Sequence, residues 1–166
     1  MPIDSRANGQ TIDETWFNIL KDAIEALEAS DVLQTTGLQI HFEIQGDYSR
    51  ESSKQDVIFY QVMQDLTVLS ARLYILTAGS AGSTQVDIKR KRAAGSYTTL
   101  FTTKPAVPYT AGSSKTSDNG TGATAAVVDS TVDELLAGDV LRFDFTAVQT
   151  NGIGCVLSLV VEPTGV

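Results

Sequence analysis

The residues best suited to chemistry are few and far apart in the sequence. His41 is the single histidine and Cys155 the single cysteine among 166 residues. A zinc site needs a cluster of such side chains, and nucleophilic catalysis needs a histidine beside a serine or cysteine. His41 lies on the polar side of one alternating segment and Cys155 on the apolar side of another, so we expect a surface histidine and a core thiol. We therefore expect no metal, no cofactor and no enzymatic activity.

Three further segments have compositions that occur in ligand sites. Residues 117–120 (SDNG) contain one carboxylate, which is too few for a Ca²⁺ loop and is typical of a turn. The Gly-rich segments lack the lysine and the following helix of a phosphate-binding loop. The basic run Lys89–Arg92 ends a predicted strand, which favours protection of a sheet edge or pairing with a partner. The 20 Asp and Glu residues leave open a carboxylate pair, and hence a small glycan hydrolase, but no pair stands out.

The net charge of −8 bears on partners and location. An acidic chain is repelled by nucleic acid and by anionic membranes, so we expect neither as a partner. The sequence has no run of about 18 apolar residues, which predicts no membrane insertion. The first residues, MPIDSRANGQ, lack the apolar segment of a secretory signal, so we expect synthesis in the cytoplasm.

Alternation of apolar and polar residues predicts a mainly β domain after residue 36. The predicted strands are residues 38–45, 57–63, 66–77, 84–92, 97–102, 125–129, 140–147 and 153–161. In residues 66–77 the pattern places Leu69, Ala71, Leu73 and Ile75 inward. Residues 131–136 fit a strand end or one helical turn. Short strands with turns every eight to twelve residues or so are typical of an antiparallel β-sandwich or jelly roll.

The clearest pattern is at the C-terminal end. Residues 140–147 and 153–161 alternate, and Asn151-Gly152 lies between them. Asn-Gly between two alternating runs is typical of a hairpin with a type I′ turn, which needs positive φ at both central residues. The sequence therefore predicts a C-terminal β-hairpin. By contrast, residues 111–124 (AGSSKTSDNGTGAT) nearly lack apolar side chains, and we expect them to be unable to order themselves.

An arm and a helix are predicted before the β domain. Thr11 to Glu14 match a capping box, which predicts a helix to about Ser30. Its apolar stripe consists of Trp16, Leu20, Ala23, Ile24 and Leu27, widened by Phe17. The stripe packs either on the β domain of the same chain or on a neighbouring chain, and the sequence leaves both open. We divide the chain into residues 1–36, the arm and helix, and residues 37–166, the sandwich.

Three segments in order resemble small structural proteins of tailed bacteriophages. Residues 5–18 (SRANGQTIDETWFN) are similar to the opening of those chains, with Arg-x-(Asn/Asp)-Gly, an Ile and a Trp-(Phe/Trp)-Asn segment that begins a helix. Residues 74–88 resemble their T-A-G-x-x-G-S-T-x-V-D-I hairpin. Residues 136–141 resemble the A-G-D-V-L entry to a late strand. The order of the three segments is more specific than any one alone.

The resemblance implies a non-catalytic protein of the virion: a tail or baseplate fibre, a collar protein or a head decoration protein. It implies a homo-oligomer, with a trimer favoured, in contact with other virion proteins and with a distal end that can meet a host surface glycan or protein. The implied anchoring residues are Arg6, Ile12, Trp16, Phe17 and Leu20. The alternative is a carbohydrate-binding module for receptor recognition, with Tyr48, Tyr97 and Tyr109 as the loop aromatics that could stack on sugars.

Overall fold

The computed structural model describes residues 38–47 and 58–164. The predicted arm and helix lie outside these ranges, and so do Arg6, Ile12, Trp16, Phe17, Leu20 and Tyr48. Their roles, and the division at residue 36, stay predictions.

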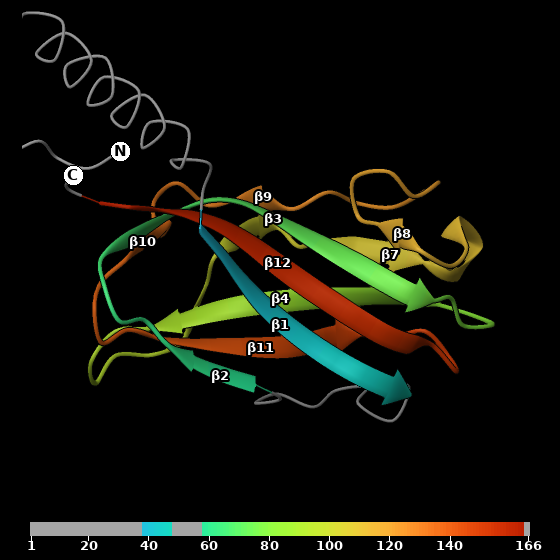
Figure 1. Cartoon of the computed structure of the whole chain (residues 1–166), viewed down its shortest axis with the longest axis horizontal. Coiled ribbons are helices and arrows are strands. Elements are labelled where there is room, and N and C mark those ends of the chain that lie inside the picture. Colours follow the sequence, from blue (N-terminus) through green and yellow to red (C-terminus); the bar gives the residue numbers. More distant parts are fainter. Residues whose placement is uncertain (1–37, 48–57, 165–166) are drawn as a thin grey trace, which may run out of the picture. The chain divides into compact units, whose positions relative to one another are not determined.

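The described residues form two main antiparallel sheets (Figure 1). The first sheet has the order β1 (Leu38–Asp47), β12 (Ile153–Pro163), β3 (Leu66–Thr77) and β10 (Glu134–Leu135), with β8 (Lys115–Thr116) beside β3. The second has the order β2 (Ile58–Gln61), β11 (Val140–Ala147), β4 (Ser83–Lys91) and β5 (Thr98–Thr99), with β7 (Ala106–Pro108) beside β4. A short 3₁₀ helix, η2 (Tyr109–Ala111), follows β7, and β6 (Phe101–Thr103) pairs separately with β9 (Val127–Val128). The prediction of a mainly β, antiparallel domain is confirmed.

The strand order is jelly-roll-like. In the first sheet β3 pairs with β12, and in the second sheet the next strand, β4, pairs with β11. The connected strands β3–β4 and β11–β12 therefore form one antiparallel ribbon that folds over, so that its two halves lie in different sheets. A double-sheet jelly roll is built from eight antiparallel strands in two Greek keys. Here β1, β2, β5 and β10 complete the set.

The predicted C-terminal hairpin is wrong. β11 pairs with β2 and β4, whereas β12 pairs with β1 and β3, so residues 148–152 carry the chain from one sheet to the other. Asn151 has a φ of +59°, but Gly152 is not among the glycines with positive φ, so the turn is not type I′. The hairpin expected in residues 74–88 is wrong in the same way. Alternation shows which side of a strand is buried, but not which strand lies beside it.

One apolar core lies between the two sheets. The ring of Phe42 in β1 stacks on Phe143 in β11, with centroids 5.9 Å apart, and Phe143 meets Phe145 edge-on at 5.2 Å. The fully buried aliphatic residues of this core are Leu73, Ile75, Val86, Ile88, Leu100, Val107, Leu135, Leu141, Leu157, Leu159 and Val161. Burying one such side chain stabilises the fold by about 1.5–3 kcal/mol.

Leu69 does not point inward as predicted. It is 48% exposed, while Val68 before it is buried. The pairing of β3 with β12 skips one residue here, because Val161 lies opposite Val68 and Val160 opposite Ser70. This bulge shifts the alternation by one position, so the side chain of Val68 points into the core and that of Leu73 does so again after the bulge.

Residues 111–124 are ordered against the expectation from their composition. Backbone hydrogen bonds hold them: the Ser117 amide donates to the Leu73 carbonyl at 2.8 Å, and Thr124 and Ala106 bond each other in both directions. The Ser117 hydroxyl is buried and accepts from the Leu73 amide at 3.2 Å. The prediction is wrong because it counted apolar burial and left out pairing with the edges of β3 and β7.

Candidate functional site

The two crossings between the sheets lie side by side and are joined by Gln149. This side chain is fully buried; its Oε1 accepts from the Gly79 amide at 2.6 Å and its Nε2 donates to the Val107 carbonyl at 2.8 Å. Backbone bonds add to this, because the Ser80 amide donates to the Thr150 carbonyl at 2.8 Å. The connection after β3, residues 78–82, and the connection before β12, residues 148–152, are therefore bonded to each other. We call these two connections together the stitched corner.

Glycine is required at Gly79 by this close approach. A Cβ there would lie 2.2 Å from the Thr150 carbonyl oxygen, far inside van der Waals contact. Gly82, also in residues 74–88, has a φ of +79°, which L side chains rarely adopt. The glycines of the T-A-G-x-x-G pattern are thus explained by the corner.

The basic run Lys89–Arg92 does not protect a sheet edge. β4 lies between β11 and β5 in the second sheet, and its cations bind groups of the same chain. The Arg90 guanidinium donates to the Val132 and Glu134 carbonyls at 3.2 and 2.5 Å. The prediction is wrong because the run falls on a central strand, where it ties the second sheet to the segment that contains β10 of the first sheet.

Arg92 makes the strongest of these contacts. Its Nε lies 3.2 Å from both carboxylate oxygens of Asp139, and its Nη2 lies 3.0 Å from Asp139 Oδ2. The Leu136 amide also donates to Oδ2, at 2.9 Å. Burial alone raises the pKa of Asp139, but Arg92 and the Leu136 amide outweigh it and hold this pKa below its usual range. Asp139 belongs to the A-G-D-V-L segment, so this motif also has a structural role.

Two carboxylates face each other on the outer side of the second sheet. Asp87 of β4 lies directly opposite Asp144 of β11, and both side chains are buried. Lys104 Nζ lies 3.0 Å from Asp87 Oδ2, and Lys89 Nζ lies 2.9 Å from Asp144 Oδ2. The Arg142 Nη2 donates to the same oxygen of Asp144 at 2.9 Å.

This carboxylate pair is arranged for structure rather than for acid–base chemistry. Glycoside hydrolysis uses one carboxyl group held protonated and one held ionised by different surroundings. Asp87 and Asp144 instead each lie within 3.0 Å of a lysine ammonium group, so the two carboxylates have similar surroundings. Within residues 38–47 and 58–164, no three His, Cys, Asp or Glu side chains lie close enough together to hold a metal ion.

The two described tyrosines of the predicted recognition site are not brought together. Tyr97 precedes β5, which pairs with Lys89 and Arg90, whereas Tyr109 follows Pro108, which lies opposite Ser83. They therefore lie beyond opposite ends of the segment from Ser83 to Arg90, which spans about 23 Å at 3.3 Å per residue.

The ring of Tyr97 already has partners within the chain. The Arg142 guanidinium lies 4.1 Å from its centroid, and Lys91 Nζ lies 5.6 Å away. Both distances are in the range of cation–π contacts. Tyr109 is 42% exposed, but as a single residue it offers no platform of several rings.

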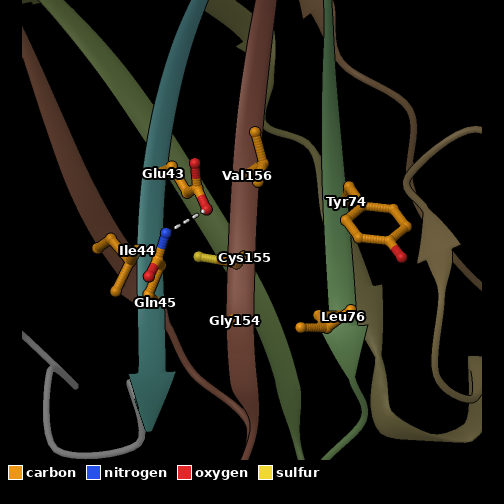
Figure 2. Close-up of a pocket in the computed structure, with 8 residues that line it drawn as sticks. All are labelled: Glu43, Ile44, Gln45, Tyr74, Leu76, Gly154, Cys155 and Val156. Carbon is orange, nitrogen blue, oxygen red and sulfur yellow. Dashed lines mark hydrogen bonds between the residues drawn. The ribbon is translucent and has the colours of Figure 1, made fainter.

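The structure contains a hollow that the sequence did not reveal (Figure 2). It has a volume of about 480 Å³ and lies on the outer face of the first sheet, across β1, β12 and β3. Val156 and Gly154 lie on the central strand; Glu43 and Gln45 flank it from β1, and Leu76 and Tyr74 from β3. Figure 2 shows Leu76 pointing towards β12 and the ring of Tyr74 on the other side of β3.

Gly154 and a bulge shape this hollow. Gly154 has a φ of +68°, and a Cβ there would lie 3.0 Å from the Leu76 Cβ. In β1 the register shifts between Ile44 and Asp47, so that two residues lie opposite Gly154. A glycine inside a strand often marks a bulge or a close approach, and this was the signal in the sequence that could have indicated the site.

The two residues with reactive side chains occupy the expected environments. His41 is exposed, and its Nδ1 lies 2.9 Å from the Ser158 hydroxyl. Cys155 is buried, and desolvation raises the pKa of its thiol to about 12. At neutral pH this thiol stays protonated and is a poor nucleophile. In the part of the chain that the structure describes, no helix is long and apolar enough to cross a membrane.

Comparison with known proteins finds similarity among solved structures. No protein-family model and no curated protein match the chain. Among solved structures, it is similar to a chain described as the capsid of Ralstonia phage GP4, with a TM-score of 0.49 and 10% identity over 78% of this chain and 86% of that one. A similarity at this level does not assign a function.

Proposed function

We propose that this chain is a structural protein of a tailed-bacteriophage virion, attached through residues 1–36, with a β domain for contacts to neighbouring subunits or to the host surface. The main support for this proposal is the location of two of the three phage-like segments in the structure. Residues 74–88 contain one of the two connections in the stitched corner, and residues 136–141 contain Asp139, which contacts Arg92. The resemblance therefore involves residues that hold the two sheets and their connections together, and jelly rolls are common in viral capsid proteins.

Exposed apolar side chains at one sheet edge support assembly into an oligomer. Within the described residues β2 is the edge strand of the second sheet, and Phe59 and Met63 at this edge are 54% and 77% exposed. An edge strand with large apolar side chains is a natural surface for a second chain. We propose a homo-oligomer, with a trimer favoured. Such an oligomer fits a fibre, a collar protein and a head decoration protein alike.

Labelling of the particle tests the virion role. Antibodies against the purified protein should bind intact virions of the encoding phage in immunogold electron microscopy, and mass spectrometry of the purified particles should detect the chain. Light scattering of the isolated protein should give a multiple of 17.7 kDa. Absence of the chain from purified particles would contradict the proposal.

The alternative of a receptor-binding carbohydrate module loses the support expected from its tyrosines. Tyr97 is covered by cations and lies far from Tyr109. Glycan recognition by this chain would have to use another surface.

A further inference from the structure

The hollow on the first sheet has the dimensions of a ligand site. Its volume of about 480 Å³ falls within the roughly 300–1,000 Å³ typical of small-molecule pockets. It crosses three adjacent strands, so it extends over two interstrand spacings, or about 10 Å. This extent suits a short oligomeric ligand that lies across the strands.

The polar side of the hollow presents hydrogen-bond acceptors. The Gln45 Nε2 donates to Glu43 Oε1 at 3.0 Å, which fixes both side chains relative to each other. Glu43 and Gln45 therefore place a carboxylate and a side-chain amide next to each other on the β1 side of the hollow. Two neighbouring acceptors match a ligand with adjacent hydroxyl donors.

The opposite side and the floor are apolar. Leu76 points over Gly154, Val156 lies on the same strand face, and Tyr74 extends the surface beyond β3. A sugar ring presents hydroxyl groups at its rim and C–H groups on its face, so it can satisfy both sides at once. The negative charge of Glu43 and the net charge of −8 disfavour acidic sugars. We propose that this groove binds a short neutral glycan.

Titration of the full chain with defined oligosaccharides tests this site. Cellotriose, maltotriose and chitotriose are added separately to labelled protein, and amide NMR shifts are followed. At least one should bind weakly, with a Kd near 1 mM or somewhat lower, and should shift resonances of β1, β12 and β3. Val156→Lys, which fills the floor, should weaken binding about tenfold or more, and Glu43→Gln should weaken it less.

Val160→Lys is the matched control, because Val160 lies on the same face of β12 but outside the groove. It should bind like the parent chain. No binding by any of the three sugars, or equal loss in both lysine variants, would overturn the proposal. Binding of Nα-acetyl-lysine methyl ester in place of the sugars would assign the groove to cationic side chains and would also overturn it. The isolated chain is used throughout, so the outcome does not depend on the virion role.

Discussion

Gln149 shows how one polar residue can hold a fold together. Its amide is the shared partner of the Gly79 amide and the Val107 carbonyl, at 2.6 and 2.8 Å, and it is fully buried. Gln149→Ala removes the side-chain partner of both the Gly79 amide and the Val107 carbonyl, so it should lower the free energy of unfolding by roughly 2–4 kcal/mol. Urea denaturation followed by fluorescence measures this. Gln61→Ala, at an exposed position, should change it by less than about 0.5 kcal/mol, and equal effects of both would refute the role of Gln149.

Asp139 should make the free energy of unfolding depend on pH. Although its burial raises the pKa, Arg92 and the Leu136 amide hold it below the ordinary value in the folded chain. A depressed folded pKa contributes stability that is present above the unfolded pKa of about 3.9 and is lost as the pH falls through the folded pKa. Asp139→Asn should therefore destabilise the protein at neutral pH and flatten the loss of stability below about pH 4. Melting curves from pH 7 downward test this, with exposed Glu162→Gln as the control; parallel curves for Asp139→Asn and the parent would contradict it.

At the scale of single residues, the sequence predicted side-chain environments better than side-chain partners. His41 and Cys155 were placed correctly because each lies in a clearly alternating segment. Gln149 follows such a segment and resembles an ordinary polar loop residue, and its partners are 70 and 42 positions away. Asp139 and Arg92 are separated by 47 positions, and no local pattern reports that kind of pairing.

The stitched corner joins the two connections between the sheets, and we expect Gly79 to be its most sensitive position. Gly79→Ala places a Cβ 2.2 Å from a backbone oxygen that cannot move away cheaply. We expect a loss of about 3 kcal/mol or more, at the upper end for overpacking and strain. Thermal unfolding of the purified variant measures this.

Gly112 provides the control for that substitution. Unlike Gly79 it has a positive φ, +86°, and a Cβ there would meet no atom within 4 Å. Gly112→Ala should cost only the strain of its backbone conformation, φ +86° and ψ 178°, about 1–3 kcal/mol. If the two variants melted alike, the contact between the crossings would have no special role.

The sequence predicted the positions of the strands more reliably than their pairing. The strands β1, β3, β4, β11 and β12 match the alternating segments to within a few residues. Their pairing did not follow, because two one-sided strands joined by a five-residue connection fit equally well in one sheet or in two facing sheets. The candidate groove was missed for the same reason: it requires the register of β1 and β3 against β12, which only the assembled sheet defines.

At the scale of the whole molecule, the predicted separation of attachment from folding can be tested by truncation. Among the described residues, the core of the β domain lies between its two sheets and includes Phe42, Phe143 and Leu157. If the N-terminal helix packs on another subunit, deletion of residues 1–30 should leave a soluble protein that unfolds cooperatively but no longer joins the particle. Aggregation of the truncated chain would indicate that the helix covers its own β domain.

Trp16→Ala tests the same question at a single residue. The two roles of the helix predict opposite effects on the melting temperature and on incorporation into particles. Loss of an aromatic residue from the core of its own domain costs about 3–5 kcal/mol, a large part of the roughly 5–15 kcal/mol that stabilises a domain. Loss of an anchoring tryptophan instead weakens assembly, often by about 2 kcal/mol or more, while the isolated chain keeps its melting temperature. We expect the second result, measured by calorimetry of the isolated variant and by its incorporation into particles. Phe145→Ala in the buried core is the control that should lower the melting temperature whatever the role of the helix. A Trp16→Ala chain that melts far below the parent and still incorporates would rule out the anchoring role.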